Sequence, residues 1–327
     1  FLSLNINDPL IKRQLKILYN SYLSNQGDIE LINKILEKST LIEKKFNLFR
    51  AEIKGEKFTD NQIRDILKKE TNSEKLREAW EASKLQGELV ATDLIGLLKL
   101  RNQLAKSLGF KNYYVFSLET NELTEEEITK IFNKLENSTN SIFKEVKDQI
   151  DKFLSKRYNV SELKPWHYQD LFFQEAPEIY NLNLDKFYTE DLLKKAENFY
   201  SGIELDVSDI IKRSDLYEKP GKYQHAYCMD LDREGDIRAV MNIKNNEYWM
   251  GTILHELGHG IYWKYIDKKL PFLIRDVSHI LTTEAIAQLF ERNSKKIYFI
   301  KKFCNVDAEE IDKIKDKIEQ SLRDRKL

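Results

Sequence analysis

The residues with the clearest chemical potential are two histidines and a glutamate in the run TILHELGHGIYW. His255 and His259 are four residues apart. Residues at that spacing lie on one face of an α-helix, so both imidazoles can bind a single metal ion. Zinc suits such a pair, because imidazole is a good ligand for it and tetrahedral geometry leaves a place for water. Glu256 can accept a proton from that water, so the pattern predicts a zinc site with Glu256 as general base.

The competing interpretation of this run is a surface helix that carries two unrelated histidines. The neighbours of the pair argue against it, because they are apolar and predict a helix that is buried on most sides: Ile253, Leu254, Leu257 and Ile261. Two buried histidines and a buried glutamate are costly unless something pairs with them. A metal ion is the simplest such partner.

A catalytic zinc ion usually has three protein ligands and one open position. The pattern HExxHxxGxxH would need a glycine and a histidine where this chain has Tyr262 and Tyr265, so the third ligand is expected further downstream. Four residues are candidates for it: Asp276, His279, Glu284 and Glu291.

Glu284 is the favoured candidate, because it lies in the largely apolar run TTEAIAQLF, where a carboxylate needs a partner. A salt bridge with a lysine or arginine is the alternative for Glu284, and His279 is the competing ligand. Glu291, followed by Arg292, has the pattern of a solvated helix end.

Most of the chain has helical periodicity, and one hairpin precedes the HELGH helix. Thr124 and Glu127 form a capping-box signature at the start of a long charged helix, and Gly109 is a C′ glycine after another. The expected helices cover residues 9–50 (broken near Gly27), 59–70, 73–108, 124–157, 190–201 (capped by Thr189), 246–265, 278–298 and 307 to the end. The expected strands cover residues 222–230 and 236–243, joined by DLDREGD.

The HELGH run, with a glutamate 25 residues after its second histidine, resembles the glutamate-zincin peptidases of the angiotensin-converting-enzyme and thimet/oligoendopeptidase F type. The segment GHGIYWKYIDKKLPFLIRDVSHILTTEAIA is similar to the corresponding part of that family, as is KLREAWEASKLQGELVATDLIGLLKLRNQLAKSLGFKNYY. The resemblance implies a mainly α, two-lobed fold with a small antiparallel hairpin beside a deep substrate channel. It also implies zinc held by His255, His259 and Glu284, and hydrolysis of short peptides.

The same resemblance assigns His225, which stands 30 residues before His255, and the adjacent Ala226 to substrate binding. An extended peptide can add itself to an exposed strand edge through main-chain hydrogen bonds. The alternative is that His225 is an ordinary strand histidine. His167 has no such support from position and is expected to be structural.

The chain departs from the family pattern in two ways. Gln288 stands where the angiotensin-converting-enzyme family has an aspartate that orients a zinc histidine. The tyrosine and histidine that stabilise the oxyanion are expected well downstream of the third ligand, yet 43 residues follow Glu284. We therefore expect these groups beyond residue 327 and a catalytic domain, 1–327, that is truncated at its C-terminus.

The composition limits which binding partners and which cellular location are expected. The formal net charge is −1, so no basic field favours nucleic acid. No apolar run approaches the ~18 residues of a membrane span, and two cysteines cannot form a disulfide framework. We expect a cytoplasmic protein without membrane partners and leave its oligomeric state open. Within residues 1–327 we expect an N-terminal helical lobe (1–120) and a zinc-binding portion (121–327).

These patterns together predict a zinc-dependent oligopeptidase. Two alternatives stay open at this point. One is a related carboxypeptidase or dipeptidyl carboxypeptidase, which would share all the zinc residues. The other is a peptide-binding relative that holds zinc without turning substrate over.

Overall fold

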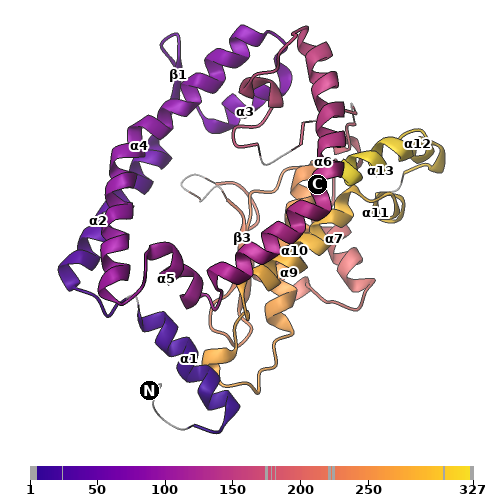
Figure 1. The fold of residues 1–327 in the computed structure, drawn as a ribbon. Helices are drawn as coiled ribbons and strands as arrows, with labels where there is room; N and C mark the ends of the chain where they lie inside the picture. The colour runs from indigo at the N-terminus through magenta and orange to yellow at the C-terminus, as the bar shows by residue number, and fades with distance from the viewer. Residues whose placement is uncertain are drawn as a thin grey trace. The chain divides into compact units, whose positions relative to one another are not determined.

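The computed structural model describes residues 6–23, 25–173, 176–177, 179–180, 182–219, 222, 225–304 and 306–324. Helices account for 65% of the structure (Figure 1), and the strands of the described residues form two small antiparallel pairs, β1–β2 and β3–β4. The predicted mainly α fold class is therefore confirmed. No helix in the described ranges combines the length and the apolar content that crossing a bilayer requires.

The chain divides into two compact units. One comprises Phe1–Leu18 with Tyr180–Arg323, and the other comprises Tyr19–Ile179 with Asp324–Leu327. The main boundary between the units falls at residues 179/180. The expected division of one catalytic domain into portions 1–120 and 121–327 remains a prediction.

The unit Tyr19–Ile179 is built around two long helices, α4 and α6. Its core packs α3, α4 and the C-terminal half of α6 with a short 3-10 helix, η1. Its elements are α2(Ile29–Leu48), β1(Ala51–Ile53), β2(Glu56–Phe58), α3(Asp60–Lys69), α4(Ser73–Ser107), α5(Tyr113–Thr120), α6(Glu125–Tyr158) and η1(Pro165–Tyr168).

Local sequence signals explain several of these boundaries. Thr124 Oγ1 accepts from the Glu127 backbone N–H at 3.2 Å, and the Glu127 carboxylate accepts from the Thr124 N–H at 3.0 Å, so the predicted capping box is confirmed. The predicted break near Gly27 separates α1(Pro9–Leu23) from α2. Gly109 follows α4 with φ +90°, as a C′ glycine should.

Two short elements of this unit were not predicted. The β1–β2 hairpin turns at Lys54 and Gly55, both with positive φ. Three-residue strands are too short for an alternating pattern to stand out. The eight-residue helix α5, capped by Asn112, was missed for the same reason, because it barely exceeds two turns.

The other unit carries the HELGH helix, α9. Its elements are η2(Asp185–Phe187), α7(Leu192–Ser201), α8(Ser208–Arg213), β3(Tyr227–Asp230), β4(Ile237–Val240), α9(Glu247–Lys264), η3(Phe272–Ile274), α10(Ile280–Glu291), η4(Arg292–Lys295), α11(Ile297–Phe303), α12(Ala308–Asp312) and α13(Lys315–Asp324).

Three predicted boundaries in this unit were wrong. Asp191, not Thr189, is the N-cap residue of α7. The predicted helix 278–298 ends at Glu291, where the chain tightens into η4 before α11 begins. The predicted helix from 307 to the end divides into α12 and α13. The strands β3 and β4 are also shorter than the predicted 222–230 and 236–243, and part of the first range lies outside the described residues.

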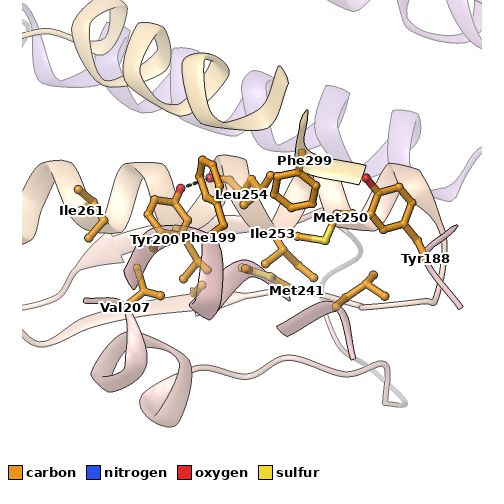
Figure 2. Close-up of a cluster of buried hydrophobic side chains, with 14 of the residues drawn as sticks. Tyr188, Phe199, Tyr200, Val207, Met241, Met250, Ile253, Leu254, Ile261 and Phe299 are labelled. Atoms are coloured by element: carbon orange, nitrogen blue, oxygen red, sulfur yellow. Dashed lines mark hydrogen bonds between the residues drawn. The ribbon is translucent and has the colours of Figure 1, made fainter. Parts of the chain in front are cut away.

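The core of this unit surrounds α9, which confirms the expectation that this helix is buried. The Tyr200 hydroxyl of α7 donates to the Leu254 carbonyl at 2.5 Å and so ties the two helices together. Figure 2 shows the packed side chains, which come from α7, α9, α11 and the flanking segments: Tyr188, Phe199, Tyr200, Val207, Met241, Met250, Ile253, Leu254, Ile261 and Phe299. This packing fixes the helix from which both motif histidines project.

Candidate metal centre

Two helices, α9 and α10, supply the candidate metal ligands and pack side by side. Their close approach depends on Gly258, because a β carbon there would lie 3.0 Å from the Ala287 Cα and from the Phe290 ring. Gly260 likewise allows α8 and β3 to approach α9 closely, because a β carbon there would lie 2.9 Å from the Ile210 side chain. The two glycines of HELGHG thus bring α10 and the hairpin close to the histidine-bearing helix.

The structure brings together the three residues predicted to hold zinc. The Nε2 atoms of His255 and His259 are 3.2 Å apart, and the Glu284 carboxylate lies 3.5 Å from the first and 3.6 Å from the second. Taking one ligand atom from each residue, all three atoms lie within 4.8 Å of one another. The lysine or arginine salt bridge considered for Glu284 does not appear among the described residues.

His255 has an outer hydrogen-bond partner that was not predicted from the sequence. Its Nδ1 atom lies 2.8 Å from the Glu291 carboxylate. Glu291 does end α10 and its side chain is partly exposed, as interpreted from the sequence. It is also seven residues after Glu284, so it lies on the same face of the helix. Gln288, which we placed in the role of the family's orienting aspartate, is exposed.

His259 has a different partner behind it. Its Nδ1 atom lies 2.7 Å from the hydroxyl of Thr283, which is itself buried. Thr283 was not predicted from the sequence. A hydroxyl directly before the favoured carboxylate, in an otherwise apolar helix, was the signal that could have identified it.

These contacts test whether the donor set fits a zinc ion. Both Nδ1 atoms are taken by hydrogen bonds, so both imidazoles turn Nε2 toward the same point, where the Glu284 carboxylate also arrives. Two nitrogen donors and one carboxylate are a typical ligand set of catalytic zinc. Outer hydrogen-bond partners on the far nitrogens are typical of zinc histidines as well. The residues fit the ion.

Burial and charge set the proton affinities of this cluster. Burial raises the pKa of Glu256, which is 6% exposed, to about 7, and the charges of Glu284 and Glu291 act in the same direction. Burial opposes protonation of His255, but the Glu291 hydrogen bond and the surrounding carboxylates raise its pKa overall. Burial and the neighbouring His255 lower the pKa of His259. A carboxylate with a pKa near neutrality is suited to general base work.

The remaining candidate ligands lie elsewhere. Asp276 pairs with Arg233 at 2.9 Å and accepts from the Trp263 indole at 3.1 Å. His279 is the N-cap residue of α10, where its Nδ1 accepts from the Leu281 N–H at 3.0 Å. Neither joins the cluster around His255.

The predicted substrate residues lie directly before strand β3. His225 is exposed and Ala226 is half-buried, and the strand begins at the next residue. Strand β4 pairs with β3 on one side and with residue Asp215 on its other side, where the Asp215 N–H donates to the Ala239 carbonyl at 2.9 Å. Among the described residues no strand pairs with the second edge of β3.

The β3–β4 loop is attached to the segment between α9 and α10 by ion pairs. Arg233 reaches Asp276 at 2.9 Å and Lys268 reaches Asp230 at 3.3 Å. Arg275, the arginine of the L-P-x-L-x-R pattern, pairs with Glu234. These contacts hold the hairpin beside the two helices that carry the candidate ligands.

The comparison with protein families agrees with this arrangement. The family model of Peptidase family M3 matches residues 66–272, which is more than half of the chain. The matched range includes β3, β4 and the whole of α9, and it ends before α10 begins. No curated protein matches the chain.

The fold and the histidine–glutamate cluster define a metallopeptidase of the glutamate-zincin type, as the resemblance implied. The chain belongs to Peptidase family M3. Membership in this family implies zinc-dependent hydrolysis of peptide bonds and peptides as substrates.

Proposed function

We propose that this protein hydrolyses short peptides at a zinc centre held by His255, His259 and Glu284, with Glu256 as the general base. The observation that carries the proposal is the convergence of the three ligand atoms within 4.8 Å beside a buried glutamate. This cluster combines residues from two helices, and the family match covers only one of them. Geometry and family membership therefore support the proposal separately.

The zinc ion would supply Lewis-acid chemistry, polarising the scissile carbonyl and making water acidic enough to attack at neutral pH. Glu256 would accept the proton of that water on its carboxylate and deliver it to the nitrogen of the leaving amine. Its raised pKa favours both directions, because a group near neutrality can take up and release a proton within one cycle.

The second edge of β3 is the proposed binding place of the peptide backbone. The Leu231 N–H donates to the Asp236 carbonyl, so residues 231 and 236 form a hydrogen-bonded pair. In an antiparallel ladder the hydrogen-bonded pairs alternate, which directs the backbone groups of Cys228 toward the other edge. Ala226, two residues before Cys228, lies directly before the strand. An extended peptide could pair with these groups, and His225 could donate to a substrate carbonyl.

The experiment replaces Glu256 by glutamine in the intact enzyme. Zinc content should stay at one ion per chain, while peptide hydrolysis should fall by ~100-fold to 10,000-fold, the usual contribution of a general base. Glu190→Gln is the matched control, because it makes the same change at an exposed residue. Unchanged turnover in Glu256→Gln would rule out this glutamate as the base. Absence of bound zinc from the wild-type protein would rule out the metal centre.

The mode of cleavage needs its own measurement. We expect cleavage of peptides that are blocked at both ends, because the proposed edge interaction requires only a peptide backbone. Cleavage that depends on a free C-terminus would instead identify a carboxypeptidase or a dipeptidyl carboxypeptidase. Zinc binding without cleavage of any peptide would identify a peptide-binding relative.

A further inference from the structure

The two candidate zinc histidines are anchored by chemically different groups. The carboxylate of Glu291 lies behind His255 at 2.8 Å, and the hydroxyl of Thr283 lies behind His259 at 2.7 Å. Both anchors belong to α10, which also provides Glu284. One twelve-residue helix therefore contributes a ligand and the outer partner of each of the other two ligands.

We propose that Thr283 is a positioning residue for zinc, which fixes the tautomer and the ring orientation of His259. This inference rests on the proposed zinc centre. When Nε2 of an imidazole binds a metal, Nδ1 carries the proton and needs an acceptor. The Thr283 hydroxyl oxygen is the acceptor that the structure places there.

Because both residues are buried, loss of this hydrogen bond should be costly. Thr283 is 2% exposed and His259 is 8% exposed, so water has little access to replace the hydroxyl. An imidazole N–H left without an acceptor in such a place pays its full desolvation cost. The ring could avoid that cost by moving its proton to Nε2, and the nitrogen would then be lost to the metal.

The neutral character of the anchor also matters. The cluster already contains three carboxylates, those of Glu256, Glu284 and Glu291. A second anchoring carboxylate would make the ligands more electron-rich, and the ion would then polarise a substrate less strongly. A hydroxyl holds His259 in place without adding a negative charge.

The test measures zinc affinity with a competing chelator and uses four variants of the full chain. Thr283→Val keeps the shape of the side chain and Thr283→Ala removes it, and both lack the hydroxyl. Thr283→Ser restores the hydroxyl. Thr282→Val makes the same chemical change at the exposed neighbouring residue.

We expect Thr283→Val and Thr283→Ala to bind zinc ~10-fold to 100-fold more weakly, which is the usual effect of losing an outer partner. Thr283→Ser and Thr282→Val should bind it with nearly wild-type affinity. The visible absorption of the cobalt(II)-substituted protein should change in the first two variants and not in the others, because it reports ligand geometry rather than stability. Circular dichroism checks that each variant is folded.

Three results would overturn the inference. Wild-type affinity in both hydroxyl-free variants would show that His259 needs no anchor. Failure of Thr283→Ser to restore affinity would show that the methyl group, and thus packing, is what matters. Equal weakening by Thr282→Val would show a general effect on α10. A wild-type protein that binds no zinc would instead overturn the proposed function itself.

Discussion

The two units of this chain each bury a histidine within a helical core, and they use its ring nitrogens differently. In the unit Tyr19–Ile179, His167 is 1% exposed, its Nδ1 accepts from the Lys164 N–H at 2.9 Å, and its Nε2 contacts the Ser73 hydroxyl at 2.8 Å. In the other unit, His259 has one nitrogen on the Thr283 hydroxyl and turns the other toward a second imidazole and a carboxylate.

The comparison teaches how to separate a structural histidine from a ligand without any ion present. Because a backbone N–H can only donate, Nδ1 of His167 must be the unprotonated nitrogen, and Nε2 must carry the proton that goes to Ser73. Protein groups thus satisfy both nitrogens of a neutral ring. Burial also lowers the pKa of His167, which keeps the ring neutral. At His259 the protein satisfies one nitrogen and turns the other toward the proposed metal site.

The largest difference between the two histidines should appear when each is replaced by alanine. His259→Ala removes a ligand, so zinc affinity should fall by more than the ~100-fold expected for an outer partner. His167→Ala should leave zinc affinity unchanged and lower the free energy of unfolding by about 2 to 4 kcal/mol, because it removes a buried ring and strands its partners. Chelator competition and chemical denaturation measure the two quantities. Loss of zinc binding in a folded His167→Ala variant would erase the distinction.

A second expected difference concerns pH, because Glu256 is buried where a charge is costly. Its pKa is raised from 4.5 to about 7, so folding favours its protonated form. The metal-free protein should therefore lose stability as pH rises from 4.5 to about 7, by about 3 kcal/mol in all. Glu256→Gln lacks this charge. The stability of the metal-free variant relative to the wild type should therefore increase as pH rises from 4.5 to about 7, and the difference should persist at higher pH. Chemical denaturation in the presence of a chelator measures the difference.

His167 should change the stability in the opposite direction as pH rises. Its pKa is lowered, so the stability that it contributes is present above its ordinary pKa of 6.5 and is lost as pH falls through the folded value. Glu190→Gln, a change at an exposed carboxylate, should show no pH-dependent difference from the wild type. A stability advantage of Glu256→Gln that stayed constant at all pH values would contradict the role of charge.

The sequence predicted the proximity of those residues of the proposed metal centre that belong to one helix. His255, Glu256 and His259 are close in the chain, so helical periodicity alone places them together. Glu284 required a resemblance to a known family, because no local rule relates a residue of α10 to one of α9. The range of the family match includes the first three residues and ends at residue 272, before Glu284.

The anchors behind the histidines depend on which face of α10 meets α9, and the sequence does not state that directly. Glu291 was set aside because Arg292 follows it, yet its carboxylate lies 2.8 Å from Nδ1 of His255. Contacts between loops that are distant in the sequence could not be predicted either. The ion pair of Arg275 with Glu234, for example, joins residues 41 positions apart and follows from packing.

A third test contrasts the anchor that the structure shows with the one that the sequence suggested. Glu291→Ala should weaken zinc binding ~10-fold to 100-fold, because His255 loses the acceptor for its Nδ1 proton. Gln288→Ala, three residues earlier on the same helix, should leave zinc affinity unchanged, since that side chain is exposed. Chelator competition measures both. A weaker site in Gln288→Ala and an unchanged one in Glu291→Ala would restore the original interpretation.

The smallest expected effect isolates the hydrogen bonds of the structural histidine from its ring. Ser73 accepts from the Trp166 indole at 3.1 Å and from His167, so Ser73→Ala leaves two N–H groups without an acceptor. The free energy of unfolding should fall by about 1 to 3 kcal/mol, and zinc affinity should not change. Ser138→Ala is the control, because that exposed hydroxyl donates to the Lys134 carbonyl of its own helix. Equal stability of the two variants would mean that His167 is held by packing alone, and the satisfaction of both ring nitrogens would then be no guide to a structural histidine.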